Sequence, residues 1–303
     1  MNDQSRTSNV ALDLCNTLID GLRKGDIPWH KPWKCLEILN PSHKGGHRYR
    51  GINLLTLSLY GQGESLFLGA GQAKTNGLAW GGKGNRGLTI LYPKLIPQKV
   101  NGKPVLNAKG KPVMQFIGWG YSKVFRLAAF VGDKADKWRK EFAPSENDIP
   151  ADEQAENVFK ATGLSLKDGG NRAYYMPAFT NSIYMPKRET FVSQSAYYRT
   201  LFHEVGHALS FLACGEKLEG GFGNESYSKE ELVAEIFANM AASFCGLDIW
   251  SDFENSQAYV NNWVSKLTDK PLQLISAANA AQKRFDWLLE RVEEQAKGEG
   301  KAA

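Results

Sequence analysis

The amino-acid sequence predicts an α+β protein, in which a small, basic, mainly β domain over residues 1–140 precedes a mostly helical domain over residues 151–303. Three observations lead to this division. Residues 1–140 hold 22 Lys and Arg against 8 Asp and Glu, whereas the remainder, by subtraction from totals of 37 and 32, holds 15 against 24. Patterns typical of strands, separated by glycine-rich turns, are concentrated between residues 88 and 130. An H-E-x-x-H sequence at residues 203–207 lies within an apolar run of helical period.

Within the N-terminal domain, helical patterns come first and strand patterns follow. Apolar spacing predicts the helices, alternation of apolar and polar residues predicts the strands, and an Asn-Gly pair predicts a tight turn. In chain order, the predicted elements are a helix over residues 10–22, a helix over 52–60, a strand over 88–94, a basic hairpin over 97–111 and a strand over 113–130. The glycine-rich segments 69–74 and 80–87 are expected to form loops. Neither has the residue order of a phosphate-binding P-loop, so no nucleotide cofactor is expected.

The breaker-rich residues 141–150 predict a linker, after which helical patterns dominate. The predicted elements are a helix over residues 152–162, strands over 174–177 and 182–186, the helix that contains the H-E-x-x-H motif, a helix over 227–240, and two closing helices over 257–267 and 272–295. Ser193 or Ser195 can cap the start of the motif helix. The strand just before that helix could be an edge to which an extended peptide adds by backbone hydrogen bonds.

His203 and His207 are four residues apart, so their imidazoles project from one face of a helix, about one turn apart. Both can bind one metal ion, with Glu204 beside them. In a hydrolytic zinc site, three protein ligands leave one position for water, and a neighbouring carboxylate takes the proton of that water as it attacks a carbonyl. The motif therefore predicts a Zn²⁺ site, with Mn²⁺ as the alternative ion and Glu204 as the catalytic base. A helix that carries two histidines by chance is the competing interpretation.

A third protein ligand is expected from the helix at residues 227–240. Glu231 and Glu235 are four residues apart and share one face of this helix. We predict that Glu231 is the ligand and that Glu235 orients a histidine, because a ligating imidazole usually donates its other N–H to a carboxylate or carbonyl. Two alternatives are open: the glutamates exchange these roles, or both belong to a solvated face.

The cysteines and the N-terminus bear on the cellular compartment. The four cysteines, Cys15, Cys35, Cys214 and Cys245, show neither a close pair nor the spacing of a cysteine metal site. No run approaches the roughly 18 apolar residues of a membrane span, and the polar N-terminus leads into no apolar signal core. We therefore expect reduced thiols, a cytoplasmic location and no membrane partner.

Several basic segments of the N-terminal domain carry aromatic residues beside cations. Single-stranded nucleic acid binds such surfaces, because bases stack on the rings and phosphates pair with the cations. The residues predicted to contact DNA are Trp29, Lys31, Trp33, Lys34, Arg48, Tyr49, Arg50, Lys83 and Arg86. An equally supported interpretation of residues 27–34 is that the two tryptophans, held by the neighbouring prolines, fill the core. His43 and His47 are also four apart, but the glycines around them disfavour a helical metal site, so phosphate contact is preferred there.

Motifs along nearly the whole chain match one protein family. They are Pro28-Trp29, Pro32-Trp33, Tyr49-Arg50-Gly51-Ile52-Asn53, Tyr197-Tyr198 ahead of His203-Glu204-x-x-His207, Tyr227 to Glu235, and Trp263. With these residues the chain resembles the ArdC-type antirestriction proteins of conjugative plasmids. The resemblance implies an N-terminal module that binds single-stranded DNA without marked sequence preference. It also implies a C-terminal metallopeptidase module of the zincin (gluzincin-like) kind, and protection of incoming DNA from host restriction during conjugation.

The expected function is therefore plasmid antirestriction by a protein that binds single-stranded DNA and carries a zinc-metallopeptidase-like domain. Its expected partners are single-stranded DNA and a host restriction-system protein. One alternative is an intracellular zinc metallopeptidase whose basic domain recruits a protein substrate. A second is a DNA-coating protein with a structural metal. Nuclease action is disfavoured, because hydrolysis of phosphodiesters more often uses paired metals.

Overall fold

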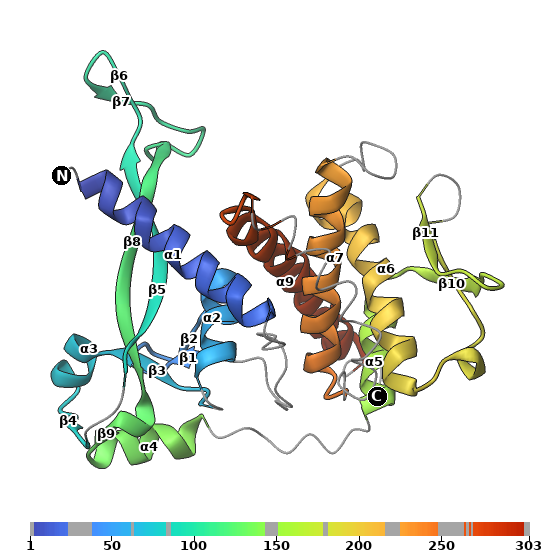
Figure 1. The fold of residues 1–303 in the computed structure, drawn as a ribbon, viewed down its shortest axis with the longest axis horizontal. Helices are drawn as coiled ribbons and strands as arrows, with labels where there is room; N and C mark the ends of the chain where they lie inside the picture. The colour runs from blue at the N-terminus through green and yellow to red at the C-terminus, as the bar shows by residue number, and fades with distance from the viewer. Residues whose placement is uncertain are drawn as a thin grey trace.

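The computed structural model describes residues 3–23, 38–61, 64–82, 86–142, 151–177, 181–215, 225–247, 264, 267 and 269–299. Most of its strands lie in the N-terminal part, whereas long helices dominate the C-terminal part (Figure 1). The predicted α+β fold class is thus confirmed. Within the described residues, no helix combines the length and apolar character needed to cross a membrane.

The main N-terminal sheet has three antiparallel strands. Its central strand is β8 (Met114–Arg126), which pairs with β3 (Phe67–Gly69) on one side and with β5 (Leu88–Pro97) on the other. The predicted strands over residues 88–94 and 113–130 are confirmed as β5 and β8, although β8 stops at Arg126. A 3-10 turn, η1 (Leu127–Ala129), follows there and leads into the short strand β9 (Phe130–Val131).

The predicted basic hairpin caps the far end of β5 and β8. Its strands β6 (Lys99–Val100) and β7 (Lys103–Pro104) are joined by Asn101 and Gly102, both of which have positive φ angles of 51° and 77°. Positive φ at both central residues is typical of the tight hairpin turn that Asn-Gly favours. The hairpin projects beyond the rest of the N-terminal part (Figure 1).

Helices cover this sheet. Helix α1 (Asp3–Arg23) is longer than predicted and packs against β8, and its Leu14 and Leu18 side chains belong to the buried apolar cluster. Helix α2 (Ile52–Tyr60) has the predicted bounds and packs against β5. The remaining N-terminal elements are β1 (Leu39–Asn40), β2 (His47–Arg48), α3 (Ala70–Thr75), β4 (Ala79–Trp80) and α4 (Asp133–Glu141).

The prediction of a loop over residues 69–74 is wrong, because this segment forms helix α3. Side-chain hydrogen bonds explain the difference. The Gln72 side-chain oxygen accepts from the backbone N–H of Gly69 at 2.9 Å and from the side-chain amide of Asn40 at 3.0 Å. Ala73, on the inner side of the helix, is buried. A local cap and one core contact thus outweigh the low helix propensity of glycine.

The C-terminal part combines helices with a second three-stranded sheet. Helix α5 (Ala151–Ala161) precedes β10 (Ser165–Asp168), β11 (Tyr174–Met176) and β12 (Ser182–Met185), and a 3-10 turn, η2 (Arg188–Thr190), follows them. The long helices among the described residues of this part are α6 (Gln194–Cys214), α7 (Glu225–Phe244) and α9 (Gln273–Glu299). The other elements agree with the predicted ones, but β10 was not predicted, and most of the predicted helix over residues 257–267 lies outside the described residues.

The strand just before the motif helix is not an edge. β12 lies in the middle of its sheet, parallel to β10 and antiparallel to β11. Both of its sides therefore already carry backbone hydrogen bonds, and the expectation that a peptide adds to this strand is wrong. The sequence places β12 next to the motif helix along the chain, whereas the parallel crossover from β10 determines its neighbours in space.

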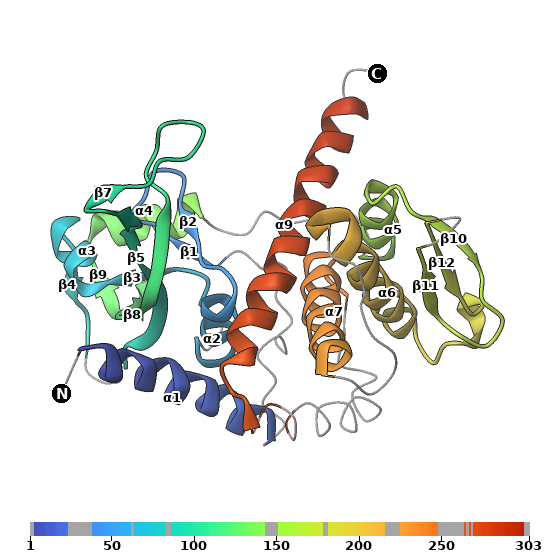
Figure 2. The ribbon, with the colours of Figure 1, turned by 90° about the horizontal axis from the view of Figure 1, so that it is seen from above.

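Helix α9 connects the two parts of the chain (Figure 2). It packs against α5, α6 and α7, and it also contacts α2. The backbone N–H of Gly51 donates to the Gln282 side chain at 3.1 Å, and Arg50 forms an ion pair with Asp286. One buried apolar cluster includes residues from α1, α2, α6, α7 and α9. The predicted division into residues 1–140 and 151–303 stays a prediction, and residues 143–150 of its linker lie outside the described residues.

Gly206 sets how closely α6 and α7 approach. A Cβ atom at this position would lie 2.9 Å from the Cα atom of Ala234 and 3.2 Å from its Cβ atom. Contacts this short require the two helices to move apart. The glycine inside the H-E-x-x-H motif therefore allows the backbones of α6 and α7 to pack in direct contact.

We predict that Gly206→Ala destabilises the metal-free protein by about 1–3 kcal/mol, because the added methyl group overpacks the interface between α6 and α7. Chemical denaturation of the metal-free variant measures this change. Gly298→Ala is the matched control, since Gly298 lies in α9 with no atom within 4 Å of the added carbon. The control should be neutral or slightly stabilising. Equal stability of the two variants would contradict the close-packing argument.

Candidate metal centre

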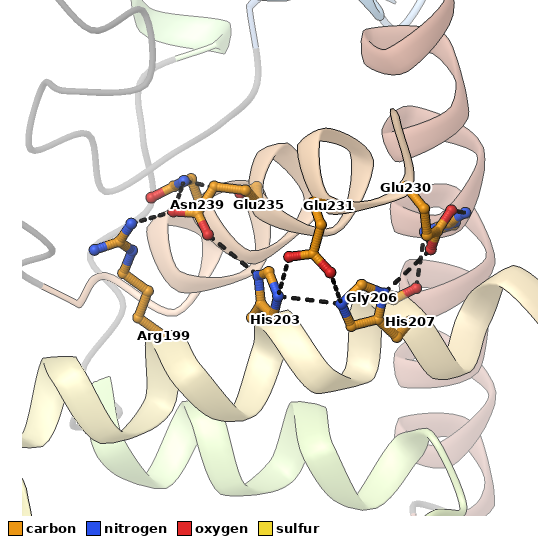
Figure 3. A network of polar contacts seen from close by, with 9 residues as sticks. Arg199, His203, Gly206, His207, Glu230, Glu231, Glu235 and Asn239 are labelled. Atoms are coloured by element: carbon orange, nitrogen blue, oxygen red, sulfur yellow. Dashed lines mark hydrogen bonds and ion pairs between the residues drawn. The ribbon is translucent and has the colours of Figure 1, made fainter. Parts of the chain in front are cut away.

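Helix α6 carries the two histidines of the candidate centre. Ser193, one of the two predicted caps, caps its N-terminus. The side-chain oxygen of Ser193 accepts a hydrogen bond from the backbone N–H of Ala196 at 3.0 Å. The side chains of His203 and His207 are 20% and 13% exposed, so they lie at the edge of the buried face. Their Nε2 atoms are 3.1 Å apart (Figure 3).

Helix α7 brings Glu231 to the same point. Its Oε2 atom lies 3.5 Å from Nε2 of His203, and its Oε1 atom lies 3.4 Å from Nε2 of His207. Ligands of a tetrahedral ion at about 2.0–2.1 Å are separated from one another by about 3.3 Å. The three donor atoms therefore have the spacing that a zinc ion requires. Among the described residues, these three side chains form the one group of His, Cys, Asp and Glu that could hold a metal ion.

The other nitrogen of each imidazole faces a carboxylate. Nδ1 of His203 lies 3.2 Å from Glu235, and Nδ1 of His207 lies 3.3 Å from Glu230 (Figure 3). An Nδ1–H that donates to a carboxylate leaves the lone pair of a neutral imidazole on Nε2. Once the Nε2 protons are displaced, the lone pairs of both rings would point at one position, where a cation can bind them.

The two orienting carboxylates are themselves anchored by arginines. Glu235 forms an ion pair with Arg199, and it also accepts from the side-chain amide of Asn239 at 3.4 Å. Glu230 accepts two hydrogen bonds from Arg284, at 2.7 and 2.8 Å. Such a bidentate pair fixes the plane of the carboxylate and hence the direction in which the histidine points.

Arg284 is unusual, because this guanidinium is only 1% exposed. It also donates to the backbone carbonyl of Gly206 at 2.9 Å, within the H-E-x-x-H motif. Loss of one partner from a buried ion pair typically costs about 3–5 kcal/mol. This arginine of α9 thus ties α6 and α7 together directly behind His207.

These hydrogen bonds shift the pKa values of the centre in the absence of metal. Burial raises the pKa of Glu235, but hydrogen bonds and charge from His203 and Arg199 outweigh it and lower the value to about 2. The pKa of Glu231 is likewise well below its usual range, because both histidines donate to it. Burial lowers the pKa of His203, but its two carboxylate partners raise the value to about 10. Without metal, His203 is therefore protonated, and its positive charge stands in for that of the ion.

Glu204 lies beside the two imidazoles and is largely buried. Burial raises its pKa, while the nearby histidines and a hydrogen bond from the backbone of Tyr175 lower it, and the net shift is upward. A carboxylate with a raised pKa is a better proton acceptor than an ordinary one. The role of Glu204 as a catalytic base stays a prediction.

Three residues near the centre were not anticipated from the sequence: Arg199, Glu230 and Arg284. Arg199 lies one helical turn before His203, and Glu230 directly precedes Glu231. Helical spacing could therefore have placed both residues near the centre. Arg284 lies 77 positions after His207, as the difference of the residue numbers gives. The one local signal for it is a cation on the apolar side of a helix, next to Phe285.

The predicted DNA contacts fall into three groups. Arg48, Arg50 and Arg86 are exposed, although Arg50 also pairs with Asp286. Tyr49 is 8% exposed, and its hydroxyl donates to the backbone carbonyl of Phe67 at 3.1 Å, so it is a core residue and cannot stack on a base. The other predicted contacts lie outside the described residues; these are Trp29, Lys31, Trp33, Lys34 and Lys83.

We predict that zinc binding at about pH 7 releases roughly one or two protons, because both histidine ligands have raised pKa values in the metal-free protein. The sign follows from competition: a proton that the ion displaces opposes binding, so affinity rises with pH up to the histidine pKa. Calorimetric titration in buffers of different ionisation enthalpy measures the number released. Binding without proton release, at an affinity independent of pH, would contradict the arrangement.

The assignment of Glu231 as ligand and Glu235 as orienting acceptor predicts unequal effects of substitution. Glu235→Gln keeps an acceptor for Nδ1 of His203 and should weaken zinc binding about 10–100-fold, whereas Glu231→Gln should weaken it more. Competition with a chromogenic chelator measures both affinities. Glu290→Gln, an exposed position on α9, is the control and should leave binding unchanged. The reverse order of effects would exchange the two roles.

Two family models match separate parts of the chain. Residues 153–280 match a zincin-like metallopeptidase, and residues 8–125 match the N-terminal domain of the anti-restriction factor ArdC. The first match contains the whole candidate metal centre except Arg284. A zincin-like domain implies a zinc site, in agreement with the predicted cofactor.

Curated relatives include two Escherichia coli proteins named DNA primase TraC, which are 35% and 34% identical to this chain. Each alignment covers 90% of this chain but only 19% and 26% of the relative. The chain thus spans about a fifth to a quarter of the length of these relatives.

Solved structures of the antirestriction protein ArdC from plasmid R388 match over nearly the full length of both chains. The metal-free structure has a TM-score of 0.71 at 27% identity and covers 94% of this chain and 98% of that one. The Mn(II)-bound structure has a TM-score of 0.67 at 28% identity, with coverages of 93% and 97%. With a match to the ArdC N-terminal domain followed by a match to a zincin-like metallopeptidase domain, the chain has the domain order and the fold of the R388 antirestriction protein ArdC.

Proposed function

We propose that this protein binds single-stranded DNA without marked sequence preference and protects incoming plasmid DNA from host restriction during conjugation. The observation that carries the proposal is the match of residues 8–125 to the ArdC N-terminal domain. This match falls in residues 1–140, whose balance of 22 cationic against 8 acidic residues gives +14. Such an excess of positive charge favours phosphates, with little dependence on sequence.

The names of the relatives support DNA as the partner. The R388 protein is called an antirestriction protein, and the Escherichia coli relatives are called DNA primases. Both names describe proteins that either act on DNA or protect it. A host restriction-system protein is the second proposed partner, and a bacterial cytoplasmic location is part of the same proposal.

The C-terminal part is proposed to be a metallopeptidase. His203, His207 and Glu231 would hold the ion, zinc or the Mn(II) found in the R388 relative. When bound, the ion supplies a Lewis acid that lowers the pKa of water and polarises a carbonyl. Glu204 would accept the proton of the attacking water, while Glu235 holds His203 in the orientation for binding.

An intracellular peptidase whose basic part recruits a protein substrate is the second candidate function. The observation that favours it is the position of β11, an edge strand whose residue Tyr175 hydrogen-bonds to Glu204 through its backbone. An extended peptide could pair with such an edge next to the proposed base. This candidate makes hydrolysis, rather than DNA binding, the source of the biological effect.

Conjugative transfer into a restricting recipient tests the two functions. We expect the wild-type protein to increase survival of the incoming plasmid, and Glu204→Gln to do so undiminished, because occupation of DNA does not require a proton acceptor at the metal. Zinc content and binding to single-stranded DNA of the purified variant serve as controls.

Two outcomes would count against this proposal. Loss of protection by Glu204→Gln, with zinc and DNA binding intact, would favour the peptidase. A wild-type protein that gives no protection, although it is expressed and folded, would remove the antirestriction function itself.

A further inference from the structure

A cleft of about 750 Å³ lies in the N-terminal part, between β2, the first residues of α3 and the paired strands β5 and β8. Its volume falls in the range of sites that enclose drug-sized ligands, and a nucleotide is a ligand of that size. The cleft is separate from the metal centre, since none of its lining residues belongs to α6, α7 or α9. Figure 1 shows β2, β3 and α3 on the two sides of the lower half of β5 and β8.

Hydrogen bonds within the protein hold the polar walls of the cleft. The side chain of Asn53 donates to the backbone carbonyl of Leu91 at 2.7 Å and accepts from its N–H at 2.8 Å, which joins α2 to β5. On the opposite side, the Gln72 side chain bridges Gly69 and Asn40. Because these contacts cross between elements, the cleft is largely preformed and a ligand would not have to order it.

The charge of the cleft is positive. Arg48, Arg50 and Lys123 are among its lining residues, and none of the lining residues is an Asp or a Glu. This asymmetry extends along the sequence: residues 65–132 contain ten Lys and Arg and no acidic residue, namely Lys74, Lys83, Arg86, Lys94, Lys99, Lys103, Lys109, Lys111, Lys123 and Arg126. A cleft with such a lining favours a polyanion over a neutral or cationic ligand.

The cleft also offers aromatic rings. Tyr92 is 48% exposed, and its ring covers Gly120 of the neighbouring strand, where a Cβ atom would lie 2.2 Å from the ring. Phe125 lies on the other strand and packs edge-to-face against Trp80, at 5.1 Å between ring centroids. Trp80 is itself 48% exposed. Glycine at position 120 thus lets Tyr92 lie flat on the sheet with a face that a base can cover.

We propose that this cleft holds a segment of the single strand, with phosphates at Arg48 and Lys123 and bases against Tyr92 and Phe125. The proposal rests on the proposed single-stranded DNA function and assigns its site. The exposed aromatic surface favours a single strand over a duplex, because stacked and paired bases cannot cover a protein ring. Arg50 has a second role here, since it lines the cleft and also pairs with Asp286 of α9.

The test compares two variants that remove the same charge. Arg48→Ala/Lys123→Ala removes two cations from the cleft, whereas Lys137→Ala/Lys140→Ala removes two exposed cations from α4, outside the lining. Fluorescence anisotropy measures binding of the full-length proteins to a labelled oligothymidylate of about 20 nucleotides, over a series of salt concentrations. Zinc affinity and the unfolding midpoint show that each variant is folded.

We expect the cleft variant to bind roughly 10-fold more weakly, and the slope of log affinity against log salt to decrease by about 1.4, since each lost phosphate contact removes about 0.7. The control on α4 should bind within about 2-fold of wild type. Equal weakening by both variants would overturn the site while leaving the proposed function intact. No binding by the wild-type protein would instead contradict the proposed function.

Photo-crosslinking locates the bases independently of charge. An oligonucleotide containing iododeoxyuridine should form crosslinks to peptides of β5 and β8 that contain Tyr92 or Phe125, as mass spectrometry of the digested complex would show. Crosslinks confined to peptides that do not line the cleft would overturn the assignment. Because this measurement uses the wild-type protein, it does not depend on the folding of a variant.

Discussion

The convergence of three side chains from α6 and α7 is the constraint on which the rest of the C-terminal part depends. Two imidazoles four residues apart supply one face, and Glu231 closes the set at 3.4 and 3.5 Å from their Nε2 atoms. This spacing exists because Gly206 lets the two helices approach in direct contact. Without an ion, the histidines retain protons and the centre is held by hydrogen bonds to carboxylates. The same geometry therefore stabilises the fold and prepares the centre for metal.

Helix α9 links the metal centre to the basic part of the chain. Arg284 holds Glu230 behind His207, and two residues further on Asp286 pairs with Arg50, which lines the proposed DNA cleft. Gln282, on the same helix, accepts from the backbone of Gly51. One rigid element thus positions groups at both candidate sites. The shared apolar cluster joins the two parts as well, and the structure of the R388 protein matches over 94% of this chain.

Local spacing was enough to predict much of the centre and of the fold. The i, i+4 rule identified His203 and His207 on α6, and Glu231 and Glu235 on α7, because neighbours on a helix face are neighbours in the sequence. Contacts between elements that are distant in the sequence could not be predicted from local spacing. Arg284, the central position of β12 and the burial of Tyr49 all follow from tertiary packing. Helix α3 was missed in part for a related reason: its Gln72 cap on Gly69 is local, but the hydrogen bond from Asn40 and the burial of Ala73 are tertiary contacts.

The most direct test of the central claim is X-ray absorption at the zinc edge of the zinc-loaded, full-length protein. The account predicts a first shell of two imidazole nitrogens and carboxylate or water oxygens at about 2.0–2.2 Å, with one zinc bound per chain and its imidazole signal lost in His203→Ala. A first shell that contains sulfur, or a spectrum that His203→Ala leaves unchanged, would contradict it. The ion would then lie away from the meeting point of α6 and α7.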